Sequence, residues 1–265
     1  MADDKRYLTD VGISGLPFPI KAISKISKEG QQTIADISIE ARVMQQFEAK
    51  WIDKFMQVLH KHREYISTKT LKANSLDYLK AMNASVVNIE FTYPFFIEKF
   101  TPVSKEKCLV KYDCAYSVKV SSIEDEPKVI FKINAPVITT SPSSVAEKAG
   151  GLFGQLTVVG IEIEPVSDVF PEDLVEIADK YSLSPVYSFL TEDDQVEIIQ
   201  KIHKSHKMSV VVADEIKSEL VHKREIKWCS VKCSNFDMMH SYSTQVKTEK
   251  SVWIPFSGYE DNSGL

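Results

Sequence analysis

The sequence is poor in glycine and cysteine, and no apolar run in it is long enough to cross a membrane. It has 9 glycines and 4 cysteines among 265 residues, and a membrane-spanning helix needs roughly 20 consecutive apolar residues. The first ten residues, MADDKRYLTD, lack the apolar core of a secretion signal. We therefore expect no membrane association and a cytoplasmic protein with reduced thiols at Cys108, Cys114, Cys229 and Cys233.

A strong charge of either sign is also missing. The formal net charge is −5, so we expect neither a broad cationic surface nor a nucleic-acid partner. Hydrophobic residues make up 43% of the chain and charged residues 26%. This composition is typical of a globular protein with a substantial core and room for two domains.

The common phosphate-binding and metal-binding motifs are absent. No G-x-G-x-x-G or G-x-x-x-x-G-K-[ST] occurs, and Gly150–Gly154 is too short and has no following lysine. There is no C-x-x-C pair, and Cys229 and Cys233 fall on one face of a predicted strand, where we interpret them as buried thiols. His203 and His206 lie in a lysine-rich segment that is typical of a solvated helix face.

Hydrophobic periodicity predicts an α+β fold. Residues 1–20 contain two prolines and two glycines and are predicted to be irregular. A strand that begins near Val87 is expected to end at Pro94, and Asp168 is the expected cap of a helix that begins at Pro171. The remaining predicted strands are 33–43, 110–120, 129–133, 155–164, 226–233 and 239–246, and the predicted helices are 47–62, 71–82, 171–181 and 193–222, the last broken near 205–209.

The order of these elements suggests two similar halves. Strand, helices and strands are followed by strand, helices and strands, although no sequence repeat is visible. We expect an N-terminal half at 1–135, a C-terminal half at 136–250 and a frayed tail at 251–265, packed as one compact subunit.

The segment Ala135–Thr157 joins the predicted halves and is the first place to look for a site. It contains a Pro-Ser turn, a short helical piece and three glycines between two strands. Binding residues often lie on such loops because a rigid scaffold holds them. An ordinary surface connection is the alternative.

A second candidate segment is Asn235–His240. Asp237 and His240 could both reach a ligand or metal near a strand start. Two ligands do not make a zinc site, which normally takes at least three protein groups. A purely structural role remains open at this point.

Three segments resemble the alternative, type IB GTP cyclohydrolase I family. They are Tyr93–Ser104 (YPFFIEKFTPVS), Asp10–Ile20 (DVGISGLPFPI) and Ser234–His240 (SNFDMMH), and their order and spacing agree over about residues 10–246. The Phe-Phe…Lys…Pro-Val-Ser pattern in the first is fairly specific.

The resemblance implies a tunnelling fold, with two antiparallel-sheet-plus-helices halves that assemble into a barrel-like homo-oligomer, a dimer or tetramer. Its sites would lie between subunits and hold GTP or a related purine or pterin. The family opens the imidazole ring of GTP with a bound divalent metal, here Mn, Fe or Zn if one is retained, and releases formate.

The sequence departs from the family pattern at most of the metal ligands. Ser141 stands where a cysteine thiolate is expected, Phe153 where a histidine is expected and Gln195 where a glutamate is expected. Asp237 and His240 keep a carboxylate and an imidazole. A serine hydroxyl is a poor metal ligand at neutral pH, so we expect no confident metal site, with Asp237 and His240 as the residual candidates.

What remains is a candidate ligand pocket. The expected catalytic residues are Ser141, Asp237 and His240. Other residues could stack on a heterocycle, contact phosphate or hydrogen-bond a ligand; these are Trp51, Lys54, Lys99, Ser143, Phe153 and Gln195. The aromatic residues among them could instead fill a vacated cavity.

Three functions are therefore open. The protein could be a GTP cyclohydrolase with altered metal use, with Glu147, Glu192, Asp193 or Asp194 replacing a lost ligand. It could be a non-catalytic nucleotide-binding or pterin-binding protein or a partner subunit. It could also be a metal-independent enzyme acting on another heterocycle. Fold similarity alone does not decide between them.

Overall fold

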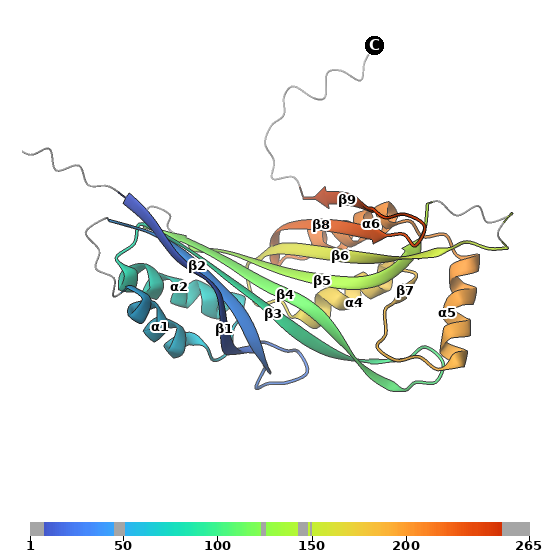
Figure 1. Ribbon diagram of the computed structural model, residues 1–265, viewed down its shortest axis with the longest axis horizontal. Coiled ribbons are helices and arrows are strands. Elements are labelled where there is room, and N and C mark those ends of the chain that lie inside the picture. Colours follow the sequence, from blue (N-terminus) through green and yellow to red (C-terminus); the bar gives the residue numbers. More distant parts are fainter. Residues whose placement is uncertain (1–7, 45–50, 123–125, 143–147, 149, 251–265) are drawn as a thin grey trace, which may run out of the picture.

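The computed structural model describes residues 8–44, 51–122, 126–142, 148 and 150–250. In these residues the chain forms one nine-stranded antiparallel sheet (Figure 1). The strands follow the chain order across the sheet, except that the two-residue strand β7 pairs with the far end of β5. They are β1 (Leu8–Ala22), β2 (Gln31–Met44), β3 (Val86–Phe100), β4 (Lys107–Ser121), β5 (Lys128–Thr140), β6 (Gly154–Pro165), β7 (Ser184–Pro185), β8 (Ile226–Phe236) and β9 (Ser243–Glu249).

Helices cover one face of this sheet. Four of them contribute buried residues to the same apolar core as the strands, and α5 stands at one end of the sheet (Figure 1). The helices of the described residues are α1 (Trp51–His62), α2 (Thr68–Met82), α4 (Pro171–Tyr181), α5 (Glu192–Lys204) and α6 (Ser209–His222). This arrangement confirms the predicted α+β class.

Strict alternation of apolar and polar residues explains the central strands. In β4 every second residue is buried against the helices, as the alternation predicts. The predicted hairpin of β4 and β5 is confirmed, with Tyr116 opposite Phe131. These two rings lie 4.6 Å apart, and Tyr93 of β3 lies 6.4 Å from Tyr116 on its other side. The sheet centre is therefore held by packed aromatic rings.

The prediction that residues 1–20 are irregular is wrong, because most of them form β1. This strand is at the sheet edge, where Pro17 and Pro19 can lack an N–H donor without breaking an inner ladder. The register shifts between Ile13 and Leu16, and Gly15 adopts φ +69° there. A glycine-containing bulge thus absorbs the irregularity that the composition suggested.

The predicted strand end at Pro94 is also wrong, because β3 continues to Phe100. The ladder between β2 and β3 stops at the pair of Asp36 and Thr92, so Pro94 lies beyond it and no β2 partner needs its missing N–H. The side chain of Gln31 then bonds both backbone groups of Phe96, at 2.7 and 2.9 Å. The strand continues because its ladder with β4 runs on to Phe100, and the Gln31 bonds replace the lost ladder on the β2 side only.

Asp168 does not cap α4, contrary to prediction. Phe170 occupies the cap position, and Asp168 instead accepts a 2.8 Å bond from the backbone N–H of Lys69 in α2. Pro171 begins the helix as predicted, and the break between α5 and α6 is confirmed at residues 205–208. The strand predicted from Met239 begins later, at Ser243. Phe47 and Ala49, in the first predicted helix, lie outside the described residues.

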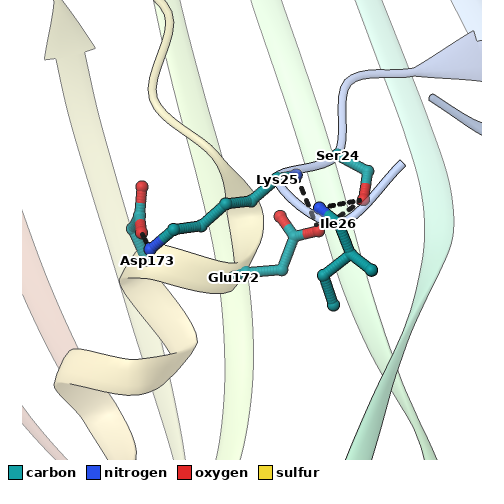
Figure 2. A network of polar contacts seen from close by, with 5 residues as sticks. All are labelled: Ser24, Lys25, Ile26, Glu172 and Asp173. Carbon is teal, nitrogen blue, oxygen red and sulfur yellow. Dashed lines mark hydrogen bonds and ion pairs between the residues drawn. The ribbon is translucent and has the colours of Figure 1, made fainter. Parts of the chain in front are cut away.

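The loop after β1 binds the first turn of α4, about 150 positions later in the chain (Figure 2). Glu172 Oε1 accepts bonds from Ser24 Oγ (2.6 Å) and from the Lys25 backbone N–H (3.0 Å). The Lys25 ammonium also pairs with Asp173 at 2.5 Å. Carboxylates are favourable at a helix N-terminus, so this turn of α4 fastens residues 24–25 to the C-terminal part of the chain.

Four further predictions concern the cysteines, a membrane span, the boundary between the halves and the C-terminal tail. The four cysteines are free and buried, as predicted for reduced thiols, and burial raises the pKa of Cys233 to about 12. Among the described residues no helix is long and apolar enough to span a membrane. The predicted boundary at 135/136 falls within β5, and the division into two halves stays a prediction. The predicted tail at 251–265 lies outside the described residues.

Candidate functional site

Two of the predicted site residues meet where β5 and β8 end. Ser141 follows β5 directly, is buried, and donates its hydroxyl to a carboxylate oxygen of Asp237, which follows β8. The backbone N–H of Ser141 donates to the carbonyl of Phe153 at 2.9 Å. We call Ser141, Asp237 and His240 the candidate site.

The carboxylate of Asp237 is held in its ionised form. The hydrogen bond from Ser141 is the main cause that lowers its pKa below the ordinary value, and the backbone N–H of Met239, 2.7 Å from Oδ1, adds to it. The side chain is 12% exposed, so a ligand can approach it. Asp237 is therefore an ionised hydrogen-bond acceptor at the surface of the sheet end.

His240 lies beside this carboxylate but at its outer edge. Its Nδ1 atom is 3.6 Å from Asp237 Oδ1, and its side chain is 36% exposed. Its ring centre is 5.0 Å from that of Tyr242. The imidazole is close enough to interact with the charge of Asp237, and it is exposed enough to contact a ligand.

The loop between β5 and β6 supplies one more predicted residue. Phe153 is half-buried, and the interaction seen is through its backbone carbonyl rather than its ring. At the β6 side of this loop, Leu152 lies against the end of α5, where its N–H is 3.5 Å from the carbonyl oxygen of His203. A side chain at Gly151 would meet the His203 ring within 3 Å. Ser143 and Glu147 lie outside the described residues.

Gln195 lies on α5, apart from the candidate site. It is exposed, and its amide nitrogen is 3.4 Å from the carbonyl of Leu190. It borders an apolar cavity of about 280 Å³ between α5 and the ends of β5 and β7. The cavity wall includes Ile138, Tyr187, Leu190, Ile198 and Ile202.

Asp194, next to Gln195, has a structural task that the sequence did not suggest. It is fully buried and accepts bonds from the backbone and hydroxyl of Thr191, the N-cap residue of α5, with which it forms a capping box. It also accepts bonds from the N–H groups of Val103 and Ser104 and the Ser104 hydroxyl. The Pro-Val-Ser segment that carries the family resemblance is thus the docking point of α5. Glu192 and Asp193, the other suggested replacement ligands, are exposed.

Lys99 is engaged on the helix-covered face of the sheet. Its ammonium group donates to Asp179 of α4 and lies 5.3 Å from the centre of the Tyr112 ring. Burial raises the pKa of Asp179, and the neighbouring Lys99 opposes this rise. A contact of Lys99 with phosphate, as predicted, would compete with this ion pair.

Trp51 and Lys54 are not brought to the candidate site within one subunit. Both belong to α1, which lies at the opposite end of the long axis from α5 (Figure 1). Trp51 is half-buried against the core and Lys54 is exposed. Their predicted role in binding would require a second subunit.

The residues at the candidate site do not fit the divalent metal that the resemblance implies. Because the Ser141 hydroxyl donates to Asp237, it keeps its proton and is a poor ligand. Asp237 and His240 remain, which is fewer than the three protein groups of a usual zinc site. In the part of the chain that the structure describes, no three His, Cys, Asp or Glu side chains are grouped to hold a metal ion.

The sequence is similar to one protein family over most of its length. A family model described as type I GTP cyclohydrolase folE2 matches residues 2–245. A GTP cyclohydrolase FolE2 of Geobacter sp. (strain M21) is 27% identical over 241 residues, covering 91% of this chain and 89% of the relative. The FolE2 protein of Dictyoglomus turgidum is 29% identical over 248 residues and 94% of both chains.

Solved structures share the fold at much lower identity. The uricase of Arthrobacter globiformis aligns with a TM-score of 0.52 and 7% identity, covering 94% of this chain and 97% of the uricase chain. Urate oxidase of Bacillus sp. TB-90 aligns with a TM-score of 0.52 and 8% identity, covering 92% and 100%. At these identities the likeness concerns the fold alone.

Proposed function

Because the chain belongs to the type I GTP cyclohydrolase folE2 family, we propose that it binds GTP or a related purine or pterin at the candidate site, with the metal-dependent ring-opening reaction altered or lost. The observation that carries this proposal is the hydrogen bond from the Ser141 hydroxyl to Asp237. Ser141 stands where the family resemblance calls for a metal-bound thiolate, and its hydroxyl is the donor of this hydrogen bond.

The chemistry of serine supports a change in metal use. A thiolate forms readily near neutral pH and binds soft and borderline metals, whereas a serine hydroxyl keeps its proton. The same proton here stabilises the ionised form of Asp237. The site is thereby organised as a hydrogen-bonding surface.

The candidate site suits the edge of a nitrogen heterocycle. Each carboxylate oxygen can accept two hydrogen bonds, and each oxygen of Asp237 receives one from within the chain, from Ser141 or from Met239. Two acceptor positions are left for the paired N–H groups of a guanine or pterin ring. His240 at the outer edge can donate or accept one more bond.

The proposal includes a homo-oligomer, a dimer or tetramer, with the ligand between subunits. Such an assembly would let Trp51 and Lys54 of one subunit approach the candidate site of another. Light scattering coupled to size-exclusion chromatography measures the mass of the assembly. A monomer at concentrations where GTP binds would remove Trp51 and Lys54 from the proposed site.

The decisive test is GTP turnover followed by mass spectrometry. Wild-type protein is incubated with GTP and Mn²⁺, Fe²⁺ or Zn²⁺, and again with a chelator, beside equilibrium dialysis with labelled GTP. We expect GTP to bind without metal-dependent release of formate, and Asp237→Ala to weaken binding. Metal-dependent formation of formate and a dihydroneopterin phosphate would overturn the proposed loss or change of activity.

The same experiment separates the two other functions. Bound GTP that is recovered unchanged under all conditions supports a non-catalytic binding protein or partner subunit. Consumption of a purine or pterin in the presence of chelator supports metal-independent chemistry. Absence of GTP binding by the intact oligomer would overturn GTP as the ligand.

A further inference from the structure

Buried polar side chains form a row across β5, β6 and β8 near the candidate site, and an exposed threonine of β9 extends the row. The hydroxyl oxygens of Thr139 (β5) and Thr157 (β6) are 2.7 Å apart. The Thr157 hydroxyl donates to the side-chain oxygen of Asn235 (β8) at 2.9 Å, and the Asn235 amide nitrogen donates to Thr244 (β9) at 3.1 Å. We call Thr139, Thr157 and Asn235 the polar row.

The direction of each hydrogen bond in the polar row is fixed. Both N–H groups of the Asn235 amide are used, one by Thr244 and one by Ser209 Oγ at 3.0 Å. The Asn235 oxygen must then accept, so Thr157 donates to it. Thr157 has given its only proton and accepts from Thr139. Replacing any member leaves a neighbour without its partner.

At the β5 end of the polar row, the hydroxyl of Thr139 also has a hydrogen-bond donor. The amide nitrogen of Gln155 donates to the Thr139 hydroxyl and to the Thr140 carbonyl, both at 3.2 Å. Thr139 and Thr157 are completely buried, so water does not replace a lost partner without rearrangement. A satisfied buried network of this kind holds its strands in one arrangement, and a broken one is costly.

The polar row and the candidate site share the same two strand ends. Thr139 precedes Ser141 by two residues, and Asn235 precedes Asp237 by two, which is one side-chain repeat of a strand. β5 and β8 are not neighbours, because β6 lies between them. The β5–β6 ladder ends at the pair of Thr140 and Gly154. Beyond it, the Ser141–Asp237 bond connects the end of β5 to the end of β8, and the polar row links the same two strands through β6 two residues earlier.

We propose that Thr139, Thr157 and Asn235 are positioning residues, which hold the ends of β5 and β8 at the separation where Ser141 reaches Asp237. The role of that contact in ligand binding rests on the proposed function, whereas the positioning itself does not. The members of the polar row on β5 and β8 precede the contact along their strands, whereas the exposed His240 follows Asp237 in the chain. The polar row acts on the site through the backbone and does not touch a ligand.

Native-state hydrogen exchange of two backbone amides tests the proposal. The Ser141 N–H is bonded to Phe153, and the Met239 N–H to Asp237, so both report on the geometry of the candidate site. Thr157→Val keeps the side-chain shape and removes the hydroxyl. We expect both amides to exchange about tenfold faster in this variant, because two buried groups lose their partners. Amides in the β3–β4 hairpin should change much less.

A matched control separates positioning from general loss of stability. Val159 lies two residues further along β6 and is also fully buried. Val159→Ala weakens the same strand without removing a hydrogen bond, so it should not accelerate Ser141 and Met239 selectively. Thr157→Ser keeps the hydroxyl and should restore slow exchange, even if Thr157→Val proves too unstable to study. The proposal would be overturned if Val159→Ala accelerated exchange of the Ser141 and Met239 amides as much as Thr157→Val does. It would also be overturned if Thr157→Ser accelerated them as much as Thr157→Val.

GTP affinity gives a second, separate measurement. If the candidate site binds GTP, Thr157→Val should weaken binding about tenfold, the loss expected for a misplaced hydrogen-bonding group, and Thr157→Ser should restore it. If Thr157→Val accelerates exchange of the Ser141 and Met239 amides selectively but leaves GTP affinity unchanged, the polar row positions the contact but does not contribute to GTP binding. Failure of wild-type protein to bind GTP overturns the proposed function, and the exchange comparison still decides the positioning.

Discussion

Asp194 and Asp237 are both acidic side chains bonded to a serine hydroxyl, yet their surroundings are opposite. Asp194 is fully buried and accepts bonds from Val103, Ser104 and Thr191. Asp237 lies at a sheet end, accepts one bond on each oxygen from Ser141 and Met239, and is partly exposed.

The number of unfilled acceptor positions distinguishes a structural carboxylate from one that can bind a ligand. A carboxylate has about four acceptor positions. Those of Asp194 are filled by the chain itself, so this residue fixes α5 to the β3–β4 turn and has nothing to offer a ligand. Asp237 keeps unfilled acceptor positions on an accessible side. A lowered pKa is common to both and does not tell them apart.

The largest effect is expected from Asp194→Asn. An amide cannot accept all the bonds that the carboxylate receives, so buried donors at the β3–β4 turn and the α5 cap lose their partners. We expect the melting temperature to fall by roughly 5 °C or more, measured by circular dichroism. Asp193→Asn is the matched control, because Asp193 is exposed on the same turn. Equal effects of the two substitutions would contradict the account.

The contribution of Asp194 should also depend on pH. Burial opposes its ionisation, but the hydrogen bonds from Thr191, Ser104 and Val103 outweigh burial and hold its pKa well below the ordinary value. A lowered folded pKa stabilises the fold above the unfolded value of about 3.9, and this contribution declines as the pH falls below it. The stability difference between wild type and Asp194→Asn should therefore be constant from pH 7 to 5 and shrink below about pH 4. Denaturant titrations at several pH values measure this stability difference. A difference that stays constant below pH 4 would contradict the prediction.

Ser141→Ala should have a smaller effect on stability and a clear local one. Loss of a single hydrogen bond costs about 1 kcal/mol, and the Ser141 bond is the main cause of the lowered pKa of Asp237. We expect that pKa to rise, as followed by NMR titration of the Asp237 carboxyl carbon. Ser117→Ala, at an exposed position on β4, is the control. An unchanged Asp237 titration in Ser141→Ala would show that the bond is not formed in solution.

The smallest effect is expected from His240→Ala. The imidazole is more than a third exposed and lies 3.6 Å from Asp237, so exposed ion-pair energetics apply and stability should change by less than about 0.5 kcal/mol. Its effect should appear instead in ligand affinity. A large loss of stability with unchanged GTP affinity would assign His240 to the fold and remove it from the candidate site.

Much of the fold follows from local pattern. The alternation in β4 and the helical spacing in α2 identify their elements directly, because one face of each is buried. β1 could not be recognised in this way, since Pro17 and Pro19 are tolerated only because the strand is at an edge. That position is decided by the whole sheet and not by residues nearby. The same holds for Pro94, whose neighbour β2 ends before it.

The candidate site was partly accessible from sequence. The resemblance identifies Ser141, the spacing in Asn235–His240 already indicates Asp237 and His240, and the structure places the three close together near the ends of β5 and β8. The buried roles of Asp194 and Asn235 are not predicted from sequence, because nearly all their partners lie far away in the chain, up to 91 positions for Asp194 and 78 for Asn235. A small signal was present: Thr191 and Asp194 have the three-residue spacing of a capping box. The ion pair of Lys99 with Asp179 had no comparable local signal.

In the proposed function, a protonated Ser141, bonded to Asp237, stands where the family resemblance calls for a metal-bound thiolate. The most direct measurement is the metal content of untagged protein, purified from cells grown with added manganese, iron and zinc and analysed by mass spectrometry of the elements. The account predicts far less than one tightly bound transition metal ion per chain, with no gain in Ser141→Ala. A stoichiometric metal ion that survives gel filtration would contradict it.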